Sequence, residues 1–169
     1  GPSVPMLFQG EEWGASTPFL YFTDHDDPAL GKAVTEGRRR EFAAFGWDPS
    51  EVPDPQDPET FRRSKLDWSE LAQPGHAEIL DWHRRLIALR RAHPAVADGT
   101  RPVSVEFDEH ARWLVVSHGS VTVACNLGSA EVEVPIPAGN VAMSSSDRSS
   151  VVAEKARLSP ESVIVLTTP

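Results

Sequence analysis

The sequence predicts an α+β chain, in which an α/β segment is followed by an all-β module. Two observations predict this order. Between residues 77 and 93, apolar residues recur at spacings of three and four, which is typical of an amphipathic helix. After Gly99, apolar residues alternate with polar ones, which is typical of strands. We therefore expect two domains, formed by residues 1–96 and residues 97–169.

The first expected element is a strand over residues 4–8. The run is apolar on both faces, which favours a strand inside a buried parallel sheet. Pro5 fits its beginning, because proline donates no hydrogen bond. Such a strand needs neighbouring strands and covering helices. A (β/α)8 barrel takes about 200–250 residues, so we expect this chain to be part of a larger protein.

Two helices are expected next. An acidic pair before Pro28 is a helix start, and this helix is expected to run toward Phe45. The proline-rich residues 48–58 predict an exposed loop. The second helix covers residues 77–93 and stops at Pro94, because proline cannot continue a helix.

The β module is predicted to contain about five short antiparallel strands. The runs "PVSVEF", "WLVVSH", "VTVACN", "VEVPI" and "SVIVLTT" supply them, and the short links between the first three predict hairpins. These features favour a compact β-sandwich. The serine-rich residues 143–150 are expected to form a mobile loop. Phe107, Trp113 and Cys125 are expected to face the core of the module.

Composition and charge argue against several classes of function. The formal net charge is −9 and the sequence pI is near 5.1, whereas a nucleic-acid binder carries a basic face. No apolar run approaches the ~20 residues needed to cross a bilayer. The single cysteine, Cys125, excludes an internal disulfide and a cysteine-based zinc site, and the histidines are scattered. We expect a cytoplasmic protein with no cofactor, no metal, and no nucleic-acid or membrane partner.

Six side chains after the predicted first strand are candidates for binding a sugar. In a parallel barrel the carboxyl ends of the strands carry the active site. Carboxylates accept hydrogen bonds from hydroxyl groups, and aromatic faces stack on the C–H groups of a sugar ring. The candidates are Glu11, Glu12, Trp13, Tyr21, Asp24 and His25. The alternative is that the two glutamates orient the loop and that the tryptophan is packed.

Three stretches of the chain resemble the α-amylase family of glycoside hydrolases. They are "PMLFQGEEWGASTPFLYFTDHDD" from Pro5, "EGRRREF" from Glu36 and "DPQDPETFRRSKLDW" from Asp54. The "GEEW" in the first resembles the end of the family's eighth barrel strand, and the other features are similar to trehalose-releasing members. The resemblance is strong over residues 4–96 and covers the β module in position and type only. It implies the last β-strand and helices of a (β/α)8 TIM barrel, followed by a C-terminal antiparallel β-sandwich.

The resemblance also implies a reaction and an incomplete site. Such enzymes cleave an α-1,4-glucosidic bond with retention, which requires two carboxyl groups only ~5 Å apart. The family's three catalytic carboxylates follow earlier barrel strands, so no catalytic residue is expected in this chain, which alone should be inactive. Asp24-His25-Asp26 is similar to the family's Asn-His-Asp motif, but it follows the eighth strand instead of preceding it. We therefore expect it to line or close the acceptor side, or to cap the next helix.

Other interpretations stay open. The parent protein is either a trehalose-releasing hydrolase or another family member, such as a glycogen branching or debranching enzyme, and the product formed would separate these. A third possibility is a non-catalytic β module that is structural or binds sugar. The expected partners are a malto-oligosaccharide substrate and the upstream barrel segment of the same protein. The arginines at 38–40 are expected on a solvated or salt-bridged helix face.

Overall fold

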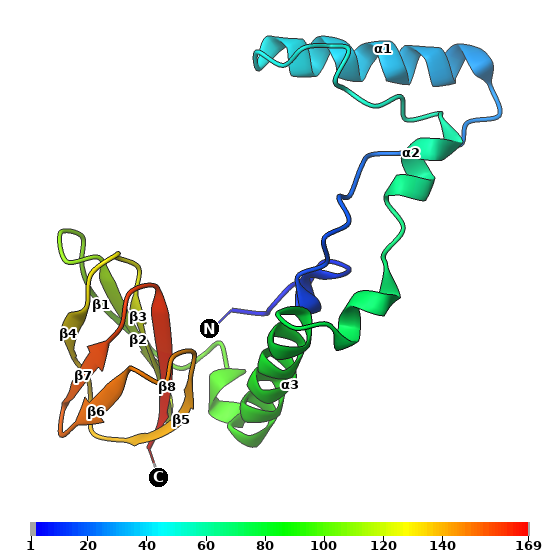
Figure 1. The fold of residues 1–169 in the computed structure, drawn as a ribbon. Helices are drawn as coiled ribbons and strands as arrows, with labels where there is room; N and C mark the ends of the chain where they lie inside the picture. Colours follow the sequence, from blue (N-terminus) through cyan, green and yellow to red (C-terminus); the bar gives the residue numbers. More distant parts are fainter. Residues whose placement is uncertain (1–2, 169) are drawn as a thin grey trace. The chain divides into compact units, whose positions relative to one another are not determined.

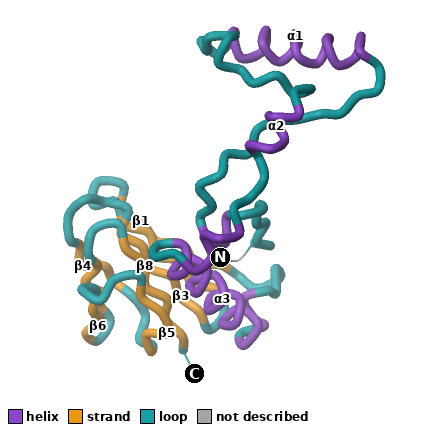
Figure 2. The backbone as a smooth tube through the Cα atoms, turned by 45° about the vertical axis from the view of Figure 1, so that its right-hand side comes forward, coloured by secondary structure: helices purple, strands orange, loops and turns teal. Residues whose placement is uncertain are grey.

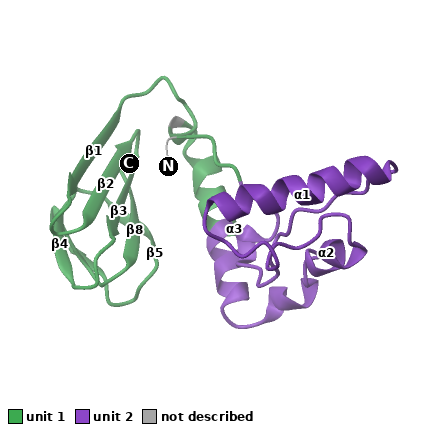
Figure 3. Cartoon of the chain, turned by 90° about the horizontal axis from the view of Figure 1, so that it is seen from above, with its two compact units in different colours: residues 1–6, 84–169 green, residues 7–83 purple. Residues whose placement is uncertain are grey.

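The structure, a computed structural model, describes residues 3–168 and separates into two compact units. Figure 3 distinguishes the helical unit, residues 7–83, from the β unit, which comprises the described parts of residues 1–6 and 84–169. The units are defined by contacts within this chain alone. The predicted domain boundary between residues 96 and 97 therefore stays a prediction.

The helical unit is built from helical elements, and three of them begin at aspartate caps. The elements are η1 (Glu11–Trp13), α1 (Pro28–Ala44), α2 (Pro58–Arg63), η2 (Trp68–Ala72) and the start of α3 (His76–Ala92), and Figure 1 labels the three α-helices. The caps precede α1, α2 and η2. Asp27 accepts a hydrogen bond from the backbone N–H of Ala29, and Asp57 accepts one from Glu59, each at 2.8 Å. Each aspartate precedes a proline at the start of its helix, where the missing N–H needs no partner.

Both predicted long helices are present. α1 ends one residue before Phe45, and α3 begins and ends one residue earlier than predicted. Pro94 begins the short helix η3 (Pro94–Val96), so the predicted stop is confirmed. The apolar stripe of α3 is not fully covered, since Ile79 and Ile87 are 41% and 42% exposed. Within residues 3–168, no helix is both long enough and apolar enough to cross a membrane.

Residues 4–8 do not form the predicted strand. The chain there has no assigned strand, and Val4 and Met6 are 88% and 92% exposed. A strand exists only through ladder hydrogen bonds to a neighbour, and the sheets of the described chain do not include this segment. The apolar pattern of residues 4–8 thus marks a segment suited to burial, without a partner strand to pair with.

The β unit contains two antiparallel sheets, visible as the orange segments of Figure 2. Their strands are β1 (Val103–Asp108), β2 (Trp113–His118), β3 (Val121–Asn126), β4 (Val132–Pro135), β5 (Asn140–Ser144), β6 (Ser150–Val152), β7 (Lys155–Leu158) and β8 (Ser162–Thr167). One sheet has the order β1-β2-β3-β8-β5 and the other has the order β4-β7-β6. The five predicted strands and the first two hairpins are confirmed.

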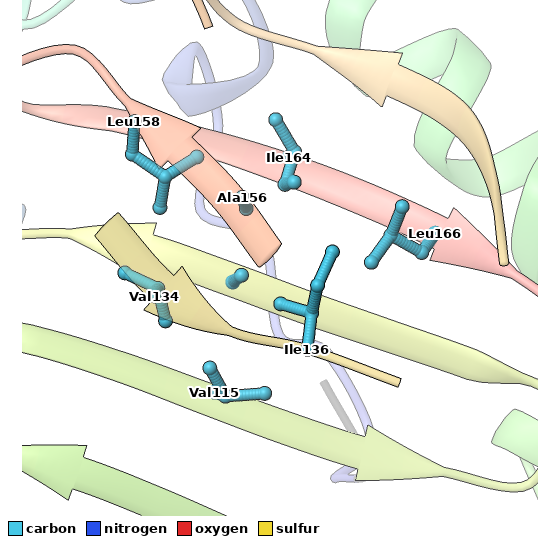
Figure 4. Packing of buried hydrophobic residues seen from close by; sticks show 8 residues of the cluster. Val115, Val134, Ile136, Ala156, Leu158, Ile164 and Leu166 are labelled. Atoms are coloured by element: carbon cyan, nitrogen blue, oxygen red, sulfur yellow. The ribbon is translucent and has the colours of Figure 1, made fainter. Parts of the chain in front are cut away.

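Side chains from the two sheets form the core of the β unit. Figure 4 shows them pointing toward one another: Val115, Ile164 and Leu166 come from the five-stranded sheet, and Val134, Ala156 and Leu158 come from the other, with Ile136 next to β4. Every member of this cluster is at most 5% exposed. Two sheets that share such a layer form a β-sandwich, as the alternating sequence predicts.

Three expectations about the β unit were wrong. Residues 143–150 are not all loop, because β5 includes Met143 and β6 begins at Ser150. Phe107 is not in the core: it is 61% exposed on the edge strand β1. Cys125 is half-buried, on the face of β3 opposite the core residue Ala124. Alternation did not identify the inward face of β3, because Val121 and Ala124, on opposite faces, are both buried.

Candidate functional site

Three of the predicted sugar-binding residues, Glu11, Glu12 and Trp13, form the single tight turn η1. Gly10 and Gly14 flank it with φ values of 84° and 63°, which L-residues with side chains rarely adopt. A Cβ on Gly10 would lie 2.7 Å from the Cβ of Ala15 and 2.8 Å from a methyl group of Leu66. Glycine is therefore required at position 10 both for the backbone conformation and for close packing.

Trp13 is buried inside the helical unit and anchors the turn η1. It is 1% exposed, and its indole N–H donates to Glu70 Oε2 at 3.4 Å. Its ring centroid lies 5.2 Å from that of Trp68, and its carbonyl oxygen lies 2.9 Å from Nδ1 of His76. Since a carbonyl can only accept, Nδ1 of His76 carries the proton. Trp13 has a packing role here, and its predicted contact with substrate stays a prediction.

Glu70 is the buried carboxylate that holds this turn. Besides the indole of Trp13, the backbone N–H of Ser16 donates to its Oε2 at 3.2 Å, and the Ser16 hydroxyl donates to its Oε1. The Ser16 hydroxyl is the main cause that holds the pKa of Glu70 below its ordinary value, with further contributions from the Ser16 N–H, Trp13 and the nearby His76. Glu70 is therefore ionised at neutral pH. Sequence reasoning missed Glu70, because its partners Trp13 and Ser16 lie 57 and 54 positions earlier in the chain, beyond the reach of any local pattern.

Glu11 and Glu12, the two glutamates of η1, differ in their surroundings. Glu11 is exposed and accepts a hydrogen bond from the backbone N–H of Phe8 at 2.9 Å, so part of its role is to close the turn. Glu12 is half-buried, and within the described chain no hydrogen bond or ion pair joins its carboxylate. Glu12 is thus the member of the pair whose acceptors are open to a ligand.

Tyr21 lies in a different group, beside α1. Its ring is 44% exposed, and the guanidinium carbon of Arg38 lies 4.3 Å from the ring centroid. Arg38 also lies 5.0 Å from the ring centroid of Phe42, one helical turn further on. The expectation of a solvated or salt-bridged Arg38 was wrong: the side chain is half-buried between two aromatic rings.

Asp24 and His25 belong to a loop that is held through its backbone. The side chain of Gln56 accepts from the backbone N–H of His25 and donates to its carbonyl, both at 3.2 Å, and it accepts from the Thr23 hydroxyl at 2.5 Å. The side chain of Asp24 is exposed. The imidazole of His25 and the carboxylate of Asp24 take no part in these Gln56 hydrogen bonds, so both remain available to a ligand.

Gln56 is itself anchored by Asp54. The Asp54 carboxylate accepts from the Thr35 hydroxyl at 2.7 Å and from the Gln56 N–H at 2.9 Å, and these bonds, Thr35 first, lower the pKa of Asp54. The proline-rich segment that was predicted as an exposed loop thus braces the residues around His25, and Val52 and Pro55 within it are buried.

The six predicted residues therefore fall into two groups. The contacts of residues 11–13 go to Phe8, η2 and the start of α3, whereas those of residues 21–25 go to α1 and the 52–56 segment. Among residues 3–168, no group of three or more histidine, cysteine, aspartate or glutamate side chains is arranged to hold a metal ion. The arrangement offers open carboxylates and aromatic faces, which suit a polyhydroxylated ligand.

Residues 98–165 match the family model described as a domain of unknown function, DUF3459. A malto-oligosyltrehalose trehalohydrolase of Brevibacterium helvolum is 49% identical over 166 residues, which cover 98% of this chain and 28% of that protein. A protein of the same name from Rhizobium sp. (strain M-11) is 47% identical over 167 residues, with the same coverage. The chain thus spans 28% of the length of these curated relatives.

Solved structures also match this chain to one part of a longer protein. A Salmonella typhimurium protein assigned to the alpha amylases has a TM-score of 0.79 and 33% identity, and the match covers 98% of this chain and 28% of that one. Trehalulose synthase MutB of Pseudomonas mesoacidophila MX-45 has a TM-score of 0.60 at 17% identity, covering 96% of this chain and 35% of that one, which shows the fold alone. Over almost its whole length, the chain is therefore similar to part of the malto-oligosyltrehalose trehalohydrolases, in the α-amylase family of glycoside hydrolases.

Proposed function

We propose that this chain is the C-terminal part of a retaining glycoside hydrolase. The parent protein cleaves the α-1,4-glucosidic bond next to the terminal trehalose of maltooligosyltrehalose and releases trehalose. The single observation that carries this proposal is the 49% identity to a malto-oligosyltrehalose trehalohydrolase over 98% of the chain. The parent acts in the cytoplasm, and its partners are the malto-oligosaccharide substrate and the upstream barrel segment.

The carboxylates of the η1 region are suited to support and not to catalysis. A retaining glycosidase needs a general acid whose pKa is raised, paired with a nucleophile. Glu70 has a lowered pKa, and its oxygens are occupied by Trp13 and Ser16. Glu11 is partly occupied by the backbone of its own turn. By the family resemblance described above, we assign the catalytic carboxylates to the upstream segment, and this chain alone is inactive.

The proposed role of η1 is to present acceptors for sugar hydroxyl groups. The open carboxylate of Glu12 and the exposed carboxylate of Glu11 lie on one short turn, which Trp13 and Glu70 hold from inside the helical unit. A rigidly held acceptor loses little conformational entropy when a substrate binds. Asp24 and His25 contribute in the same way from a backbone that Gln56 fixes.

A hybrid protein tests the proposal. The hybrid is the Brevibacterium helvolum relative with its matching segment replaced by this chain, and the unmodified relative is the positive control. Incubation with maltooligosyltrehalose should yield trehalose and a linear malto-oligosaccharide. A folded hybrid that releases no trehalose would show that this chain does not supply a trehalohydrolase segment, and would favour another family member, such as a branching enzyme, as its parent.

The isolated chain provides the second arm of the test. Incubated alone with maltooligosyltrehalose, it should release no trehalose above the buffer blank. Trehalose release by the isolated chain would show that the catalytic carboxylates lie within residues 1–169 and would overturn their assignment to the upstream segment.

A further inference from the structure

A hollow of about 200 Å³ opens in the helical unit beside Tyr21. We call it the Tyr21 hollow; its lining includes Tyr21, Arg38, Phe42, Trp47, Val52 and Pro53. Pockets for drug-sized ligands measure roughly 300–1,000 Å³. The Tyr21 hollow is smaller, so it suits a ligand about the size of one six-membered ring.

Aromatic faces form two of its walls. Trp47 is 56% exposed, so its ring is open to a ligand, whereas the guanidinium of Arg38 lies over the ring of Tyr21. The lining also includes the buried Val52. The ring centroids of Phe42 and Trp47 lie 5.4 Å apart with their planes at 66°. The rings of Phe42 and Trp47 therefore meet at an angle, and a sugar ring in the hollow can stack on Trp47 while its edge meets Phe42.

Arg38 supplies hydrogen-bond donors at the same place. Its guanidinium lies over the rings of Tyr21 and Phe42, and Arg38 itself lines the hollow. A guanidinium has five N–H donors, and within the described chain none of them takes part in a hydrogen bond or an ion pair. Arg38 is half-buried and contacts two aromatic rings, which restricts its orientation before a ligand arrives.

We propose that the Tyr21 hollow binds one glucosyl unit of an α-glucan. This inference rests on the proposed function for the class of sugar. A pyranose ring has apolar C–H faces, which stack on the exposed ring of Trp47, and a rim of hydroxyl oxygens, which accept hydrogen bonds from Arg38. An anion is a poorer fit, because anion sites gather several donors and this lining holds one cation among rings and aliphatic side chains.

Titration of the chain with maltotriose, followed by tryptophan fluorescence and by nuclear magnetic resonance, tests the site. Saturable binding is expected, with a dissociation constant on the order of 1 mM for so small a contact. Trp47→Ala removes one wall and Arg38→Leu removes the donors, and each should weaken binding about tenfold or more. Arg38→Lys keeps the charge but not the stacking, and should weaken binding by an intermediate factor.

Phe107→Ala is the control, since it removes an exposed aromatic side chain outside the hollow. Phe107 is 61% exposed on β1 and does not line the hollow, so its removal should leave the maltotriose affinity unchanged. Circular dichroism checks that each variant is folded. Three results would each overturn the inference: absence of saturable binding, wild-type affinity in folded Trp47→Ala and Arg38→Leu, or binding of inorganic phosphate in place of maltotriose.

The outcome is separable from that of the proposed function. If the hybrid releases trehalose while the chain fails to bind maltotriose, the hollow is not a glucosyl site and the proposed function stands. If the chain binds maltotriose through Trp47 and Arg38 while the hybrid releases no trehalose, the hollow stands as a glucosyl site and the proposed function fails.

Discussion

Asn126→Ala should destabilise the β unit more than most single substitutions. Asn126 is 1% exposed at the end of β3. Its side-chain amide nitrogen lies 2.8 Å from the carbonyl oxygen of Ala130, 2.9 Å from that of Ser159 and 3.3 Å from that of Leu158. Its amide oxygen accepts from the N–H of Gly128 at 2.9 Å. One side chain thus ties the turn after β3 to the end of β7.

The magnitude follows from the groups left unpaired. The two amide N–H groups and the amide oxygen of Asn126 sustain about three hydrogen bonds at one time, each worth roughly 1 kcal/mol net, and a buried group left without a partner costs roughly 1–3 kcal/mol. Gly128 and Ser159 are buried, so water reaches their freed backbone groups poorly. We expect a loss of about 3–5 kcal/mol in the free energy of unfolding.

Urea unfolding measures this loss in free energy, and amide hydrogen exchange in β3 and β8 provides a second measurement of it. Asn140→Ala is the matched control: Asn140 is exposed, and its loss should change the unfolding free energy by less than about 0.5 kcal/mol. Asn126→Asp should cost at least as much as Asn126→Ala, because it turns a carboxylate oxygen toward carbonyl oxygens. If Asn126→Ala unfolds within about 0.5 kcal/mol of the wild type, the reasoning is refuted.

Three further predictions concern single groups. Gly10→Ala should cost about 1–3 kcal/mol through its positive φ and its clash with Ala15, and should speed hydrogen exchange in residues 11–16; unchanged exchange would contradict this. Because the pKa of Glu70 is lowered, its bonds are complete above its ordinary pKa and are lost as the pH falls through the lowered value. The indole N–H resonance of Trp13 should shift only in that acidic window, and a shift that persists in Glu70→Gln would refute the assignment. Burial raises the pKa of Cys125, so a thiol reagent should modify it at least about tenfold more slowly in the folded chain than in urea, and equal rates would contradict the burial.

Local sequence patterns predicted the elements that local physics decides. An aspartate followed by a proline starts α1 because both the cap and the proline act within the first turn. The period-two alternation of β2 and β3 predicted their pairing, because a short link leaves a hairpin as the simplest connection. β5, β6 and β7 were missed. β5 does not alternate, β6 has only three residues, and β7 contains no β-branched or aromatic residue.

The candidate site was predicted in composition but not in arrangement. Glu11, Glu12 and Trp13 were identified from their place after an apolar run, and the structure adds that Trp13 is packed while Glu12 is open. Glu70 was missed because its partners are distant in sequence. Arg38 was misjudged because charge patterns along a helix do not reveal an aromatic ring from another segment.

The rate of trehalose release by the hybrid tests the central claim most directly. In one assay, the hybrid and the unmodified Brevibacterium helvolum relative are given maltooligosyltrehalose, and circular dichroism establishes that both are folded. If this chain supplies a trehalohydrolase segment, kcat/KM of the hybrid should lie within about a hundredfold of the relative, equivalent to less than ~3 kcal/mol of transition-state stabilisation. A folded hybrid that releases no trehalose would contradict the account.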